Sequence, residues 1–188
     1  MHNDAINGDR VARERFSRLV QDNNIRSIVE TGTYHGITTD FLSSLCDNVH
    51  SIEIDPRYLD ISKVLIGDNP NIHLYLGDSP TILTTILPNI PGPIFFFLDS
   101  HWGGYCPLID ELQIIAEMGV RDPVIAIHDF LVPGTDLGYD VYNEQALSFD
   151  YVEPKLSHLY PKGFKTEYND ATAEGSRRGI LYLTPADR

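Results

Sequence analysis

Residues 28–36 read Ile-Val-Glu-Thr-Gly-Thr-Tyr-His-Gly and decide the fold. A short β-branched run ends in the carboxylate of Glu30, and Gly32 and Gly36 follow it. This pattern is typical of a strand that turns tightly into a helix, where free backbone amides can hold the acidic group of a ligand. The spacing differs from the Gly-x-Gly-x-x-Gly of a nicotinamide-binding turn. A lone Gly-x-x-x-Gly is also common in structural turns, so the rest of the chain must supply the context.

A second acidic strand end supplies part of that context. Residues 49–54 read as a buried strand that ends at Glu53. An acid about twenty residues beyond a glycine-rich turn is well placed to accept hydrogen bonds from a ribose diol, which makes Glu53 the expected ribose ligand. Asp55 and Pro56 are better explained as the N-cap and first residue of a helix.

A third strand, over residues 71–76, leads into Gly77 and Asp78. Ser79 and Pro80 then predict the start of a helix. The carboxylate of Asp78 can therefore serve a ligand or cap this helix, and the pattern alone leaves both open.

Composition predicts one compact domain over residues 1–188, with 42% hydrophobic residues to fill a core. No apolar run is long enough to span a bilayer, and the polar start lacks the order of a leader peptide, so a cytoplasmic location is expected. Cys46 and Cys106 are expected to be unpaired thiols.

The formal net charge of −13 argues against a nucleic-acid partner, which needs clustered Lys and Arg to meet phosphates. It favours a neutral or cationic small molecule, or one whose charge is met by a metal. Arg177 and Arg178 form the strongest basic cluster and are expected to be solvated or strand-flanking charges. A homodimer is compatible with the sequence.

Apolar strands near residues 27–30, 49–54, 71–76, 93–98 and 123–127 alternate with helical patterns. This alternation predicts an α/β fold with a doubly wound parallel sheet. A helical segment within residues 1–24 is expected to pack over the sheet or the active site. Residues 130–160 fit either a substrate lid or an ordinary surface connection, with a helix through Tyr160. Two final strands are expected over residues 163–169 and 179–184.

The ordered set Glu30-x-Gly32-x-x-x-Gly36, Glu53 and Gly77-Asp78 resembles the motifs of the class I S-adenosylmethionine-dependent methyltransferases. The resemblance covers nearly the whole chain and implies a Rossmann-like, seven-stranded, mostly parallel sheet with an antiparallel last strand and helices on both faces. It implies S-adenosylmethionine as cofactor and adenosylhomocysteine as product, with Asp78 at the adenine amino group. The expected cofactor-binding residues are Glu30, Gly32, Thr33, Tyr34, Gly36, Glu53, Ile54, Asp78, Ser79 and Asp99.

Potential metal ligands follow the next two strands. The apolar run 94–98 delivers Asp99 and His101, and the run 124–127 delivers His128 and Asp129. Their convergence at neighbouring strand ends is what a carboxylate and imidazole metal site needs. The chain is similar here to metal-dependent O-methyltransferases of the catechol and macrolide-sugar type, which places Asp99, His128 and Asp129 on the positions that hold a divalent cation such as Mg²⁺.

The chain departs from that pattern, because His128 replaces an acid and no lysine follows Asp99. The expected catalytic residues are therefore His101, Asp99 and His128, with His101 as the base beside a metal or with the histidines acting alone. The expected reaction is attack of an acceptor oxygen of a small molecule on the sulfonium methyl group. Trp102, Tyr105 and residues 130–142 are expected to select the acceptor.

Oxygen is favoured because the Asn/Asp-Pro-Pro-Tyr/Phe sequence of many nitrogen methyltransferases is replaced here by Asp99-Ser-His-Trp. Two other functions stay open. His101, His128 and a carboxylate could form the triad of a non-haem metal oxygenase or hydroxylase. The chain could also be a non-catalytic adenosylmethionine-binding protein, such as a regulatory or assembly subunit.

Overall fold

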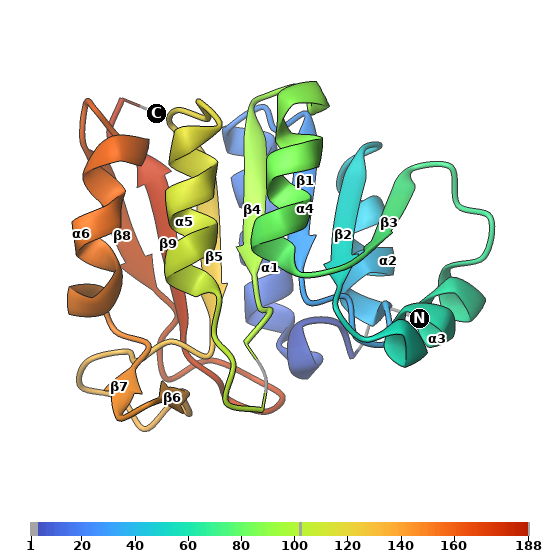
Figure 1. Cartoon of the computed structure of the whole chain (residues 1–188). Helices are drawn as coiled ribbons and strands as arrows, with labels where there is room; N and C mark the ends of the chain where they lie inside the picture. Colours follow the sequence, from blue (N-terminus) through green and yellow to red (C-terminus); the bar gives the residue numbers. More distant parts are fainter. Residues whose placement is uncertain (1–3, 102, 188) are drawn as a thin grey trace.

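The computed structural model describes residues 4–101 and 103–187. Strands and helices alternate along most of the chain (Figure 1). The strands are β1 (Ser27–Thr31), β2 (Val49–Glu53), β3 (Ile72–Leu76), β4 (Ile94–Leu98), β5 (Val124–His128), β6 (Val141–Tyr142), β7 (Gln145–Ala146), β8 (Phe164–Tyr168) and β9 (Ile180–Pro185). The helices are α1 (Arg10–Asp22), α2 (Ile37–Ser43), α3 (Pro56–Ile66), α4 (Ser79–Ile86), α5 (Leu108–Glu117) and α6 (Phe149–Leu159), with short 3₁₀ turns at Ala5–Gly8 and Leu87–Asn89.

Seven strands form one sheet in the order β3-β2-β1-β4-β5-β9-β8. The first five are parallel, and β9 is antiparallel to both of its neighbours, which confirms the predicted fold. The register pairs Thr31 with Leu98 and Leu98 with Ile127, so β1, β4 and β5 end at the same level. The polar residues that follow these strands therefore meet at one edge of the sheet.

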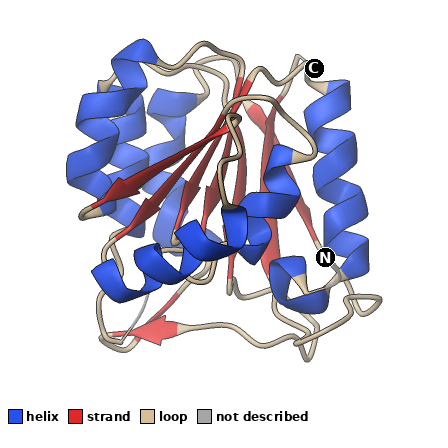
Figure 2. Ribbon diagram, turned by 90° about the vertical axis from the view of Figure 1, so that its right-hand side faces the viewer, coloured by secondary structure: helices blue, strands red, loops and turns tan. Residues whose placement is uncertain are grey.

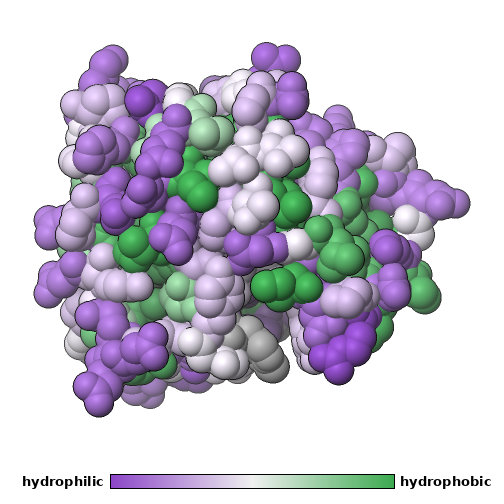
Figure 3. Space-filling view, in the orientation of Figure 1, coloured by the Kyte–Doolittle hydropathy of each residue, from purple (hydrophilic) through white to green (hydrophobic). Residues whose placement is uncertain are grey.

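Helices cover both faces of the sheet (Figure 2). Alternate strand residues point to opposite sides because side chains along a strand alternate. Phe96 and Leu98 pack with α4, α5 and α6, whereas Phe95 and Phe97 pack with Phe16 of α1 on the other side. Figure 3 shows the side of the molecule that α4, α5 and α6 cover. Its surface is mainly polar, with apolar side chains visible between the polar ones. None of the described helices is long and apolar enough to cross a membrane.

Residues 130–160 contain a loop, a small hairpin and the expected helix. A hairpin of β6 and β7 precedes the helix α6, and it was not predicted. Val152 and Leu156 of α6 are buried against the sheet, so the helical half of the segment belongs to the core. The loop between β5 and the hairpin, and Tyr142 of β6, lie at the strand ends, at the lower edge of the sheet in Figure 1.

The ends of several elements agree with their sequence signals. Asp55 caps α3, and its side chain accepts a hydrogen bond from the Arg57 amide at 2.8 Å.

Cys46 and Cys106 are free, half-buried thiols. Arg178 flanks β9, which is one of the two expectations, and its guanidinium contacts the carboxylates of Asp129 and Asp140.

Candidate functional site

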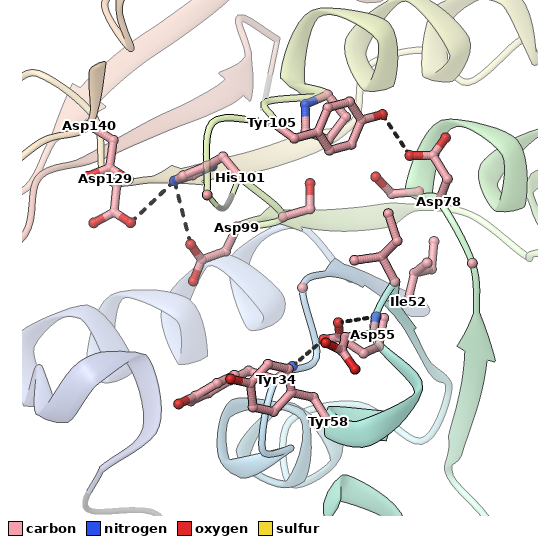
Figure 4. A pocket seen from close by; sticks show the side chains of 18 of the residues that line it. Tyr34, Ile52, Asp55, Tyr58, Asp78, Asp99, His101, Tyr105, Asp129 and Asp140 are labelled. Carbon is pink, nitrogen blue, oxygen red and sulfur yellow. Dashed lines mark hydrogen bonds and ion pairs between the residues drawn. The ribbon is translucent and has the colours of Figure 1, made fainter. Parts of the chain in front are cut away.

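A cavity of about 710 Å³ lies beyond the carboxyl ends of the parallel strands. Ligands in open α/β sheets bind at this position. Of the residues named individually as candidate ligands, catalytic groups or acceptor contacts, those that line the cavity are Gly32, Tyr34, Glu53, Ile54, Asp78, Ser79, Asp99, His101, Tyr105 and Asp129. Figure 4 shows Asp99, His101 and Asp129 together at one end, with Tyr34 and Asp55 at another side and Asp78 beside Tyr105. Trp102 lies outside the described residues.

Glu53 is held in place by backbone amides. Its Oε2 accepts a hydrogen bond from the Tyr34 amide at 2.7 Å, and its Oε1 accepts one from the Asp55 amide at 2.8 Å. A carboxylate oxygen has two acceptor sites, so each oxygen can still accept a hydroxyl. The carboxylate is thus oriented toward the cavity and keeps the capacity to bind a diol.

Gly32 permits a close approach between two loops. Its φ is +92°, and a Cβ at this position would collide with the backbone carbonyl of Asp99. The glycine is therefore needed to seat the chain after β4 against the turn after β1. The same contact fixes where Asp99 enters the cavity.

Three residues of the first motif lie behind the cavity wall. Glu30 is fully buried, and its Oε2 accepts hydrogen bonds from Thr39 at 2.5 Å and Ser51 at 2.6 Å. Burial raises the pKa of Glu30 to about 8. The hydroxyls of Thr33 and Ser51 share a hydrogen bond, and Gly36 packs against Ser62 of α3. These three support the turn from behind and do not line the cavity.

Asp78 faces the cavity and makes no capping hydrogen bond with α4. Its Oδ1 accepts a hydrogen bond from the hydroxyl of Tyr105 at 2.7 Å. Tyr105 follows β4, so this contact closes the loop after β4 over the end of β3 (Figure 4). Because the carboxylate leaves the helix amides alone, it is available to a ligand.

Glu111 of α5 supports the cavity from behind and was not predicted. The carboxylate is 1% exposed, and its Oε1 accepts hydrogen bonds from Ser79 at 2.5 Å and Ser100 at 2.7 Å. Burial raises the pKa of Glu111. Both serines line the cavity, so Glu111 positions two parts of its wall.

The acids and histidines after β4 and β5 form one cluster. His101 Nε2 lies 3.2 Å from Asp129 Oδ2 and 3.8 Å from Asp99 Oδ1. His128 Nδ1 lies 3.2 Å from Asp129 Oδ1 and 3.5 Å from Asp99 Oδ1. The structure therefore brings together all four residues predicted for the chemistry, with His101 on the cavity wall and His128 buried behind it.

The carboxylates in this cluster favour a positive charge. Burial disfavours the charged form of His128, but Asp99 and Asp129 outweigh it and raise the pKa of His128 to about 10. The pKa of His101 is also raised, because the hydrogen bond with Asp129 and the charge of Asp99 exceed the effect of burial. The neighbouring cations hold the pKa of Asp129 well below its usual range, although its burial acts the other way.

The residues present fit a divalent cation at one of two places. Ligand atoms lie within 4.8 Å of one another in the set Asp99, His128 and Asp129, and in the set His101, Asp129 and Asp140. Among the described residues, His128 Nδ1 is buried without a hydrogen-bond partner although it faces two carboxylate oxygens, as expected for a nitrogen that shares a cation with them. Arg178 already contacts Asp140, which occurs only in the second set, and Asp129, which both sets share. The two histidines fall in different sets of described residues, which argues against a two-histidine triad.

Asp140 and Arg178 complete this end of the cavity. Asp140 lies in the segment 130–142 that was expected to select the acceptor, whereas Arg178 was not predicted as a site residue. Arg178 donates hydrogen bonds to Asp129 and Asp140, and the hydroxyl of Tyr142 donates to Asp140 at 3.1 Å. Asp140 and Tyr142 line the cavity. These ion pairs and hydrogen bonds therefore hold the loop after β5 at the cavity.

Comparisons with known proteins agree on the architecture. No protein-family model and no curated protein sequence matches the chain. Among solved structures, the O-methyltransferase TomG of Streptomyces achromogenes, involved in tomaymycin synthesis and solved with S-adenosylmethionine, matches with a TM-score of 0.67 and 14% identity over 93% of this chain and 79% of that one. An O-methyltransferase of Bacillus cereus in complex with adenosylhomocysteine matches with a TM-score of 0.66 and 14% identity over 94% and 81%.

An rRNA methylase of Streptococcus thermophilus also matches, with a TM-score of 0.62 and 14% identity over 93% of this chain and 94% of that one. By their names, two of these proteins are O-methyltransferases and the third is an rRNA methylase, so the likeness concerns the fold and not the acceptor. The strand order and the cavity at the strand ends agree with it. The chain thus has the Rossmann-like fold of the class I S-adenosylmethionine-dependent methyltransferases.

Proposed function

We propose that the chain is an S-adenosylmethionine-dependent methyltransferase that methylates an oxygen of a small molecule. The observation that carries the proposal is one continuous cavity with Glu53 and Asp78 along one part and Asp99 and His101 at the other. The first pair suits the ribose and the adenine of the cofactor. The second pair suits an acceptor hydroxyl beside the methyl group.

The cofactor half is built to orient the nucleoside. Glu53 accepts hydrogen bonds from the ribose hydroxyls while the Tyr34 and Asp55 amides hold its carboxylate. Asp78 accepts one from the adenine amino group, and Ile54 offers an apolar surface to the ring. Fixing the donor in this way leaves the sulfonium methyl group to be aligned with the acceptor.

The acceptor half supplies the proton chemistry. The acceptor oxygen forms a bond to the methyl carbon as the carbon–sulfur bond breaks, and adenosylhomocysteine leaves with the bonding electron pair. The acceptor's proton passes to His101, whose positive charge is stabilised by Asp129 and Asp99. A small acceptor is favoured over RNA because the net charge is −13 and three carboxylates gather at this end.

Asp99, His128 and Asp129 would hold a divalent cation beside this position. When bound, such a cation lowers the pKa of an acceptor hydroxyl. Arg178 keeps the carboxylate of Asp129 oriented from the other side.

Calorimetry with S-adenosylmethionine and adenosylhomocysteine tests the proposal, with NAD as the competing nucleotide. Both sulfur ligands should bind, and NAD should not. Transfer of a labelled methyl group to a panel of phenols, sugars and amines then identifies the acceptor class. Absence of binding at millimolar concentration would exclude the function, and binding without transfer to any acceptor would favour the non-catalytic alternative.

A further inference from the structure

The cation site after β4 and β5 has an unusual donor for an oxygen-rich site. Two of its ligands, Asp99 and Asp129, offer carboxylate oxygens, and the third offers an imidazole nitrogen, His128 Nδ1. Carboxylates suit Mg²⁺, whereas imidazole suits Zn²⁺, Fe²⁺, Co²⁺ and Ni²⁺. The nitrogen is therefore the donor that can set the preference between these classes of cation.

The position of His128 is fixed by the fold. It is the last residue of β5 and pairs with Ile180 of β9. Its ring is 2% exposed and meets the ring of Phe97 edge-on, with centroids 6.0 Å apart and planes at 84°. A buried ring packed in this way cannot turn out to solvent, so its nitrogen stays between the two carboxylates.

Arg178 limits the cluster to one cation. Its guanidinium contacts Asp140, which belongs only to the second ligand set, and Asp129, which both sets share. An arginine remains charged in proteins, so it neutralises these acids permanently. A second dication there would have to displace it. A hydrogen bond from Arg178 also orients Asp129 for the first set, as is common for carboxylates that bind metals.

We propose that Asp99, His128 and Asp129 bind a single first-row transition-metal dication in preference to Mg²⁺. The preference follows from the buried nitrogen that faces two carboxylate oxygens without hydrogen-bonding to either. The inference deepens the proposed methyltransfer site, but metal binding can be measured without cofactor or acceptor. Its outcome is thus separate from that of the cofactor-binding test.

The experiment titrates the metal-stripped full chain with Mg²⁺, Mn²⁺, Co²⁺ and Zn²⁺, followed by calorimetry and by the visible absorption of Co²⁺. One Co²⁺ should bind per chain, at least tenfold more tightly than Mg²⁺. His128→Asp should reduce or reverse that ratio by restoring an all-oxygen set. The matched control is His73→Asp, because His73 is an exposed histidine of β3 and its replacement should leave the ratio unchanged.

X-ray absorption of the Zn²⁺-loaded wild-type chain should show scattering from one imidazole, and His101→Asn, which removes the imidazole of the second set, should leave that signal unchanged. This measurement decides the matter if His128→Asp does not fold. Equal affinity for Mg²⁺ and Co²⁺, binding of two ions, zero or two imidazoles around Zn²⁺, or no binding of any dication would each overturn the inference.

Discussion

Glu53 accepts a hydrogen bond from the backbone amide of Tyr34 at 2.7 Å, which ties the end of β2 to the turn after β1. This contact holds the carboxylate at the cavity wall before any ligand arrives. Glu53→Ala should weaken adenosylhomocysteine binding by about 1.5–3 kcal/mol, as for a lost hydrogen bond to a charged group. Calorimetry measures the change, and Asp60→Asn on the exposed side of α3 is the control. Unchanged affinity in Glu53→Ala would remove Glu53 from the ribose role.

Gly32→Ala tests the close approach of the two loops. Alanine at a positive φ costs about 1–2 kcal/mol by itself, and overlap with the Asp99 carbonyl should add about 1–3 kcal/mol as overpacking does. Gly119→Ala is matched, because Gly119 has a φ of +81° and nothing within 4 Å of the added Cβ. Urea unfolding should show that Gly32→Ala lowers the free energy of unfolding more than Gly119→Ala does. Equal losses would mean that the collision is relieved without cost.

Glu30 should make the stability of the chain depend on pH. Its pKa is about 8 in the folded state, against a usual value of 4.5. The folded state therefore holds a proton that the unfolded state has lost, so this stabilisation is complete below about pH 4.5 and is lost as pH rises through 8. Its contribution to the free energy of unfolding should fall by up to about 1.4 kcal/mol per pH unit in that window.

Glu30→Gln cannot ionise and should remove that part of the slope. Chemical unfolding of both chains at several pH values between 4.5 and 8 gives the difference, in which the histidines common to both chains cancel. Parallel profiles would show that Glu30 is ionised in the folded chain.

Arg178 and Arg177 are neighbours with different surroundings. Arg178 contacts Asp129 and Asp140 with a side chain that is 26% exposed, whereas Arg177 pairs with Asp136, which is 80% exposed. Arg178→Met should destabilise the fold by about 1–3 kcal/mol, because two partly buried carboxylates lose their cation. Arg177→Met should cost less than about 1 kcal/mol. Urea unfolding gives the free energy of unfolding of both variants. Similar decreases in the two would contradict the network described for Arg178.

The parts of the site that follow strands could be predicted because their signals are local. Glu53, Asp78 and Asp99 each lie at or just after the end of a strand that the sequence predicts, so the local pattern indicates both the strand and the place where it ends. The order of the sheet and its antiparallel strand came from the family resemblance. Periodicity alone does not state which strands are neighbours.

The residues that support the site could not be predicted in the same way, because their partners lie far from them along the chain. Arg178 lies 49 positions from Asp129, and no local pattern pairs them. Glu111 had a usable signal, because it shares the buried face of α5 with Leu108, Leu112 and Ile115. A carboxylate on an apolar helix face predicts a buried partner, which here is a pair of serines on the cavity wall.

Asp78 should determine the choice of base. Its carboxylate can only accept hydrogen bonds when ionised, which suits the amino group of adenine and opposes the carbonyl of hypoxanthine. The wild-type chain should therefore prefer adenosylhomocysteine to its inosyl analogue by about 1–3 kcal/mol, or roughly 5- to 150-fold in affinity. Asp78→Asn offers an amide N–H to the carbonyl and should narrow that preference.

The family resemblance also implies that the Ser79 amide donates a hydrogen bond to a ring nitrogen of adenine. Hypoxanthine carries an N–H at the corresponding ring position, so Asp78→Asn should narrow the preference only in part. Tyr105→Phe is the matched control, since it removes the phenol that donates to Asp78 and leaves the carboxylate intact. Competition calorimetry with both ligands gives the ratio for each chain. If Asp78→Asn keeps the wild-type ratio of the two affinities while Tyr105→Phe changes it, the loop after β4 and not Asp78 determines which base is bound.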